Sequence, residues 1–166
     1  GVSMLLYWTC QFLFDLTLCC IVSVFDVLLL KLLPADVGAY SLCLPLYVLF
    51  VADCASMLLS NYAISFLFNS PRLASICYLA VVFISYLPDP GSSNDVLQSI
   101  WSFLRPLPPV ALQEGISTIF LNILTGNSES PWTFDILGFP LMTMAISSVL
   151  SIIALVAIET GAIGRV

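Results

Sequence analysis

Long apolar stretches, separated by short polar or proline-rich segments, dominate the pattern of residues along this chain. Three of these stretches, at about residues 5–33, 40–68 and 135–159, exceed the roughly 20 residues that a helix needs to cross the hydrocarbon layer of a bilayer. A fourth, at about residues 72–88, is shorter and crosses only where the bilayer thins or flanking residues extend the helix. The pattern therefore predicts four membrane-spanning helices, which would leave both ends of the chain on one side.

The segment between the third and the last apolar stretch, at about residues 95–125, has a different pattern. It predicts two short helices, Val96–Leu104 and Val110–Leu124, and neither is long enough to cross a bilayer alone. Between them lie Arg105 and three prolines, and a proline inside a helix removes an amide donor and clashes with a preceding carbonyl. We therefore expect a re-entrant or interfacial helical hairpin here, with Arg105 reaching toward lipid headgroups.

The amino-acid composition places the chain in the membrane class. Hydrophobic residues make up 60% of it, charged residues make up only 8%, and the mean hydropathy is +1.09. Soluble globular domains carry about 25% charged residues, so this class is excluded. The net charge of -6 leaves no basic patch for nucleic acid, which is not expected as a partner. The expected fold is an all-α, polytopic transmembrane domain of an integral, multi-pass membrane protein.

Three aspartates interrupt the apolar stretches and are the candidate polar sites within the membrane. Asp15 and Asp26 share one face of the first predicted helix, where snorkelling to either interface explains them. Asp53 lies near the middle of the second span, where an acid costs about 2.5 to 3.5 kcal/mol. It is either part of a proton or cation path or a protonated or hydrogen-bonded acid at a helix interface. Because the neighbouring spans offer only serine and threonine as partners, we expect Asp53 not to be a proton relay.

Small residues at helical spacing mark one face of the second predicted span and one face of the last. They are Ala52, Ser56, Ser60 and Ala63 on the second, and Ser147, Ser151 and Ala154 on the last. Small side chains let two helices approach closely in a membrane, so we expect close helix packing at these faces rather than a polar substrate path.

The sequence contains few of the residues and motifs that usually carry out catalysis or bind metals. Histidine is absent, and the six cysteines form no CxxC pair and lie in apolar stretches. The GxxxxGK, GxSxG and HExxH motifs are absent as well. No catalytic residue, cofactor site or metal site is therefore expected in this chain. It begins at Gly1 without the features of a signal peptide, so we expect an internal piece of a longer protein.

Three segments resemble ABC transporters of subfamily A, and they occur in the order of that family. The opening segment, GVSMLLYWTCQFLFDL, is similar to the family's segment after a cytoplasmic coupling helix, with Gly-Val, Tyr-Trp and a later Asp in matching places. YAISFLFNSPRLA, residues 62–74, resembles the family's next cytoplasmic turn. PWTFDILGFPLMTMAISSVLSIIALVAIE, residues 131–159, resembles the family's last helix.

The sequence departs from the family pattern in two of its segments. In the opening segment, Gln11 and Phe14 stand where the family usually has Asn and Trp. In the hairpin, Glu114 and Gly115 stand near where family members commonly carry Gly-Arg-Gly.

The resemblance implies a type V exporter fold, in which six helices per half precede a cytoplasmic ATPase domain and a re-entrant exoplasmic hairpin separates the last two. Residues 1–166 would form the C-terminal part of one transmembrane domain, with both ends in the cytoplasm and no ATPase domain. The resemblance also implies ATP-driven movement of lipid or another hydrophobic substrate, with ATP and magnesium bound elsewhere in the parent protein. Partners would be membrane lipids and the transporter's other transmembrane helices and nucleotide-binding domains. Two alternatives remain open: an ion- or proton-coupled secondary carrier, and a structural membrane subunit.

Overall fold

The computed structural model describes residues 4–30, 42–66, 68, 70–85, 104–125 and 130–160, and the regular elements among them are all helices. This result agrees with the predicted all-α fold. In chain order the elements are α1 (Met4–Leu30), α2 (Cys43–Ser65), α3 (Pro71–Ser85), α5 (Pro108–Leu124), a π-helical turn η3 (Phe134–Gly138) and α6 (Phe139–Glu159).

Three helices in the described part of the chain are long and apolar enough to cross a membrane. They cover Leu6–Leu29, Cys43–Ser65 and Phe134–Glu159, which match three of the four predicted spans. The fourth predicted span corresponds to α3, whose 15 residues extend over about 22 Å and so fall short of the roughly 30 Å hydrocarbon layer. Residues 86–88 of that span lie outside the described residues. The structure therefore gives three candidate spans and does not confirm the fourth.

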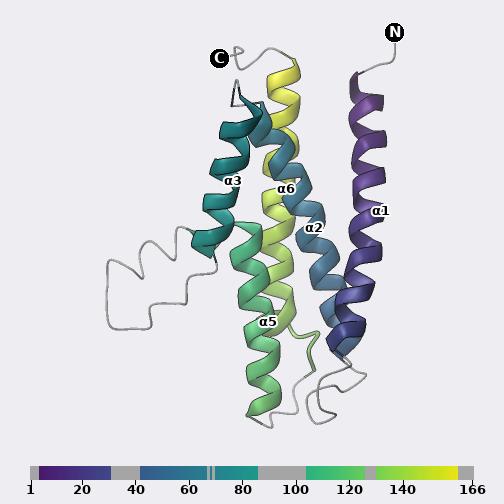
Figure 1. Cartoon of the computed structure of the whole chain (residues 1–166). Helices are drawn as coiled ribbons and strands as arrows, with labels where there is room; N and C mark the ends of the chain where they lie inside the picture. Colours follow the sequence, from purple (N-terminus) through teal and green to yellow (C-terminus); the bar gives the residue numbers. More distant parts are fainter. Residues whose placement is uncertain are drawn as a thin grey trace, which may run out of the picture.

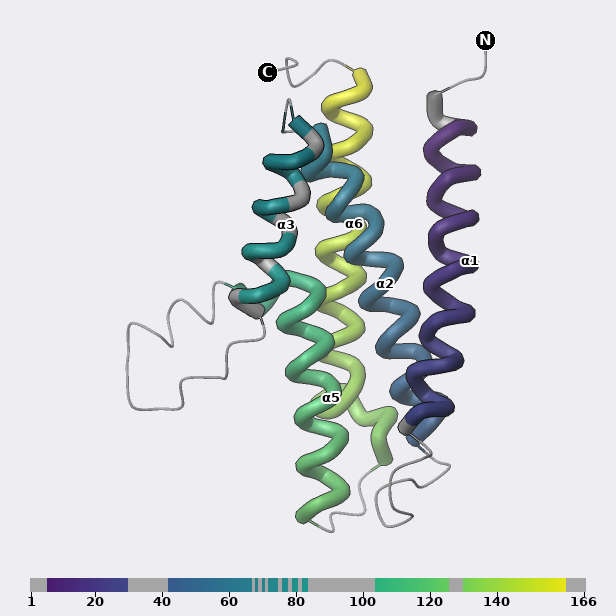
Figure 2. The backbone as a smooth tube through the Cα atoms, in the orientation of Figure 1, coloured from purple at the N-terminus to yellow at the C-terminus, as the bar shows by residue number. Residues whose placement is uncertain are grey.

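The helices form an elongated bundle in which α2 is central (Figure 1). α1 lies along one side of α2, and α6, α5 and α3 lie on its other side. α2 and α6 run in the same direction, whereas α1 and α5 run the opposite way (Figure 2). The N-terminal end of α1 and the C-terminal end of α6 are at the same end of the bundle (Figure 1). Buried residues make up 28% of the most apolar part of α2 but only 11% in α1 and in α6, which agrees with the central position of α2.

The small-residue faces of α2 and α6 lie against each other, and close packing at both faces agrees with the sequence prediction. Ser56 on α2 and Ser151 on α6 are buried, and the hydroxyl oxygens of Ser60 and Ser151 are 3.1 Å apart, within hydrogen-bond distance. Small side chains at these positions permit the close approach, which agrees with the packing that such residues favour in membranes.

The core of the bundle lies where α5 meets α2 and α6. Gly115 on α5 is needed for this approach, because a Cβ atom there would lie 2.9 Å from Cδ2 of Leu49 and 3.3 Å from Cβ of Pro140. Leu49 is fully buried, and Ile119, Leu137 and Met144 are almost completely buried around it. The packing of α5 therefore depends on one glycine that faces both long helices.

The start of the last helix is irregular. The sequence predicted an ordinary helix from about residue 135, but the structure has a π-helical turn over Phe134–Gly138 before α6 begins. Pro140 has no amide proton, so it cannot donate to the carbonyl of Ile136 as a regular helix would require. The wider turn accommodates this break, and the amide of Gly138 donates to the carbonyl of Thr133 at 3.3 Å.

Candidate functional site

Asp15 has partners on both α1 and α2. The side-chain amide of Gln11 donates to both carboxylate oxygens of Asp15, at 3.1 Å each, and the hydroxyl of Tyr62 on α2 donates to Oδ2 of Asp15. The sequence explained Asp15 by snorkelling to the membrane interface. In the structure its half-buried carboxylate instead joins two neighbouring helices.

Aromatic rings surround the bond between Asp15 and Tyr62. The ring of Trp8 lies 5.3 Å from that of Tyr62 and 5.5 Å from that of Phe66, measured between centroids. Such pairs add to the stability gained from burial alone. We call Trp8, Gln11, Asp15, Tyr62 and Phe66 the Asp15 cluster. The sequence did not reveal this cluster, although the spacing of four residues between Gln11 and Asp15 was a signal for the local pair.

We expect the Asp15 cluster to couple α1 to α2 energetically. Tyr62→Phe removes the hydroxyl and keeps the ring against Trp8, and Asp15→Ala removes the oxygen that accepts from it. In a double-mutant cycle the two changes should show a coupling of about 0.6 to 1.7 kcal/mol, the range measured for hydrogen bonds between membrane helices. Unfolding in detergent with increasing denaturant measures it. Strictly additive effects would mean that the bond does not contribute to stability.

Asp53 is the most deeply buried of the three predicted acids. Its residue is 9% exposed, and its Oδ1 atom has no hydrogen-bond partner within the described ranges. The hydroxyl of Ser56 donates to the backbone carbonyl of Asp53 at 3.0 Å and so does not serve the carboxyl group. On the adjacent residue, the thiol of Cys54 lies beside Cys19 and Ser23 of α1. Asp53 is therefore a buried acid whose Oδ1 atom finds no polar partner in the described structure.

Asp26 lies near the C-terminal end of α1 and is half-buried. It follows the buried Ser23 by one turn and immediately precedes the buried Val27. Within the described ranges, the structure assembles no group of three histidine, cysteine or acidic side chains that could hold a metal ion. Asp15, Asp26 and Asp53 therefore do not form a common site.

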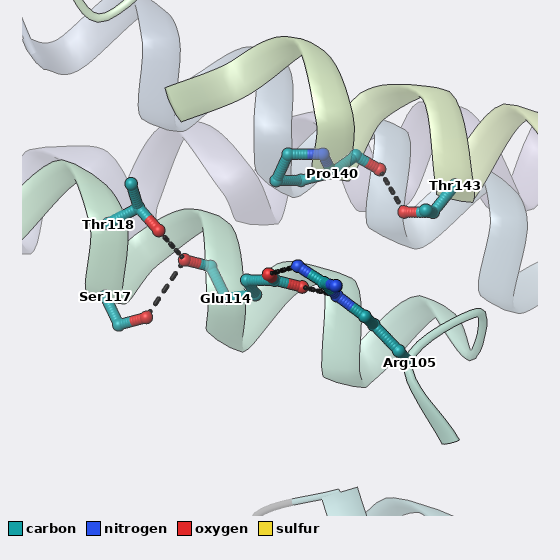
Figure 3. Close-up of polar contacts among 6 residues, drawn as sticks. All are labelled: Arg105, Glu114, Ser117, Thr118, Pro140 and Thr143. Atoms are coloured by element: carbon teal, nitrogen blue, oxygen red, sulfur yellow. Dashed lines mark hydrogen bonds and ion pairs between the residues drawn. The ribbon is translucent and has the colours of Figure 1, made fainter. Parts of the chain in front are cut away.

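Arg105 lies in the turn before α5 and pairs with Glu114 of that helix (Figure 3). Its Nε atom donates to Oε2 of Glu114 at 3.0 Å, and its Nη2 atom donates to Oε1. The guanidinium carbon also lies 4.5 Å from the centre of the Phe139 ring, a cation–π distance. The sequence expected Arg105 to reach toward headgroups. The side chain instead turns back along α5, because the fork of the guanidinium matches a carboxylate in two parallel bonds.

An apolar cavity of about 310 Å³ lies between the C-terminal part of α1 and the N-terminal part of α2. Its lining is almost entirely hydrophobic, and it comprises Val24, Val27, Leu28, Cys43, Leu44 and Tyr47. The arrangement can accommodate apolar groups, but it brings together no residues for catalysis.

The described side chains therefore offer a hydrogen-bonded cluster between two helices, one buried acid, one exposed ion pair and an apolar cavity. They do not form the constellation of an enzyme. A comparison of the chain with protein-family models, curated proteins and solved structures finds no match.

Proposed function

We propose that this chain is a membrane-spanning part of an ATP-driven transporter of the ABC subfamily A type, which moves lipid or another hydrophobic substrate across or out of the bilayer. The observation that carries the proposal is the order of the three resembling segments. The first lies on α1, the second covers the end of α2 and the start of α3, and the third covers η3 and α6. Each therefore falls on a helix or helix connection of the kind that the resemblance requires.

The arrangement of the helices supports the same proposal. The start of α1 and the end of α6 lie at one end of the bundle, which is compatible with the cytoplasmic ends of this proposal (Figure 1). In this proposal α3 and residues beyond it complete a fourth crossing, and α5 is the second arm of a re-entrant exoplasmic hairpin. ATP and magnesium bind to nucleotide-binding domains elsewhere in the parent protein, and the ATPase activity belongs to those domains.

The proposal predicts an ATPase domain downstream in the same polypeptide, with a GxxxxGK[ST] motif whose lysine contacts the nucleotide phosphates. The purified full-length protein, reconstituted in vesicles, should hydrolyse ATP faster when its lipid substrate is present. Replacement of the motif lysine by alanine should abolish this hydrolysis. A parent protein with no ATPase domain in its own chain or in an associated chain would refute the proposal.

A second candidate is an ion- or proton-coupled carrier, and the unpartnered Oδ1 atom of Asp53 is the observation that favours it. A carrier site normally gathers several polar partners at one depth, whereas Oδ1 of Asp53 has no hydrogen-bond partner within the described ranges. We therefore expect Asp53→Asn to leave substrate-stimulated ATP hydrolysis within about threefold of the unmodified protein, because an amide of the same size can take the place of the carboxyl group at a buried position.

Asp26→Asn is the matched control, since Asp26 is also an acid within a span but is less buried. If Asp53→Asn abolishes transport in a folded protein while Asp26→Asn does not, the carrier function is supported. The ABC proposal would then not explain why Asp53 is essential. A structural membrane subunit would tolerate both changes and would show no ATP-dependent transport.

A further inference from the structure

The start of α5 lies near the middle of the long helices rather than at one of their ends. Gly115 of α5 packs against both Leu49 of α2 and Pro140 of α6. α5 runs opposite to α2, so Pro109, six residues before Gly115, lies about 9 Å from Leu49 in the direction of Ala55. Ala55 is next to the midpoint of α2, whose bounds are Cys43–Ser65. Figures 1 and 2 agree, because in both views α5 begins about halfway along its neighbours.

The backbone amides at the start of α5 do not depend on hydrogen bonds to water. Pro108 and Pro109 have no amide proton, and the amides of Val110 and Ala111 both donate to the carbonyl of Leu107 at 3.1 Å. The amide of Leu107 itself donates to the carbonyl of Leu104 at 2.9 Å. The amide donors that a helix normally leaves free at its start are therefore absent or satisfied. A helix that starts in this way can do so inside a membrane.

The side chains beside this start do need a polar environment. The side chains of Arg105 and Glu114 are 47% and 30% exposed, although they pair with each other. Ser117, one turn beyond Glu114, is also exposed. Charged groups at this depth are unfavourable against lipid tails and occur where they face protein or a water-filled cavity. Arg105 cannot escape to the interface, because its guanidinium is held by Glu114 and by the ring of Phe139.

We infer that the face of α5 that carries Arg105, Glu114 and Ser117 lines a water-filled inlet, which reaches the middle of the membrane. The inlet opens at the end of the bundle opposite the start of α1 and the end of α6, because α3 contacts α5 and lies between the start of α5 and the end of the bundle where α1 starts. This inference depends only on the membrane position of the long helices. It holds whether or not the parent protein hydrolyses ATP.

Cysteine accessibility in the full-length protein tests the inlet. In a background without the native cysteines, Pro106→Cys places a thiol in the exposed turn before α5. Ile146→Cys is the control, because Ile146 is 49% exposed on α6 and lies six residues beyond Pro140, about level with the start of α5. A membrane-impermeant, charged maleimide is added to sealed vesicles from each side in turn. Thr125→Cys, at the exposed C-terminal end of α5, identifies the side on which the inlet opens.

Only a thiol in contact with water forms the reactive thiolate, so Pro106→Cys should react at least about tenfold faster than Ile146→Cys, from the side that labels Thr125→Cys. Equal, slow reaction at Pro106→Cys and Ile146→Cys would overturn the inference, as would reaction of Pro106→Cys only from the opposite side. If Pro106→Cys does not fold, the ratio of the maleimide reaction rates of Ser117→Cys and Met142→Cys tests the inference in the same way, since Met142 is exposed on α6. ATP hydrolysis by the same vesicles is measured separately. The labelling rates therefore test the inlet, and the hydrolysis tests the proposed transporter function.

Discussion

Truncation of Leu49 to alanine should lower the free energy of unfolding by about 2 to 5 kcal/mol, the largest single effect expected in this domain. Leu49 is fully buried on α2, and its side chain lies against Gly115 of α5, which also lies against Pro140 of α6. Alanine would leave a cavity that three helices share, and the surrounding backbone could close it only in part. Denaturant unfolding of the purified domain in detergent measures the loss.

Leu44→Ala is the control for this prediction. Leu44 lies on the same helix but is 60% exposed, so its truncation should change the free energy of unfolding by less than about 0.5 kcal/mol. Similar losses for Leu44→Ala and Leu49→Ala would mean that the contact of α5 with α2 does not contribute to stability.

Replacement of Gly115 by valine should cost about 1 to 3 kcal/mol through overpacking. The first added carbon would already lie 2.9 Å from Leu49, whose side chain can rotate away, and 3.3 Å from Pro140, whose ring cannot. Gly115→Ala should therefore cost less than Gly115→Val, because alanine adds only that first carbon. The thermal unfolding temperatures of the two variants in detergent test this order.

Ser117→Val is the matched control, since it places the same side chain two residues away on an exposed part of α5. Ser117→Val should leave the thermal unfolding temperature nearly unchanged. A larger loss for Ser117→Val than for Gly115→Val would show that α5 packs through a different face.

The long helices could be predicted from the sequence because length and hydropathy alone decide them. α2 and α6 fall within the predicted spans, α1 begins one residue before its predicted span, and α5 begins only two residues before its predicted start, at the prolines. Close packing at the small-residue faces could also be predicted, because small residues at helical spacing permit close approach in a membrane, but the sequence did not show which two helices meet. The short length of α3 was expected from its apolar stretch, but nothing in that pattern distinguishes a helix that crosses from one that stops partway.

The pairings of polar side chains could not be derived from the sequence. Tyr62 and Asp15 are 47 residues apart, and their contact depends on how α1 and α2 align along each other. Arg105 and Glu114 lie in one short segment, but the proline-rich turn between them decides whether the two side chains meet. For Arg105 the available signal was the presence of a single acid and a single base nine residues apart. The sequence prediction named only lipid headgroups as partners of Arg105 and did not include Glu114.

The position of α1 at the edge of the bundle has a consequence for how the domain comes apart. The main contact of α1 in the described structure is with α2 alone, whereas α2, α5 and α6 all contact one another. Stability within a protein follows the density of such contacts, so a helix that packs mainly on one neighbour opens at a lower free energy than helices that pack on several. α1 should therefore exchange its backbone amide protons for deuterium earlier than the three helices around Leu49. α2, α5 and α6 would behave as a rigid trio from which α1 can separate, and the bond between Asp15, near the middle of α1, and Tyr62, near the end of α2, would hold α1 to that trio.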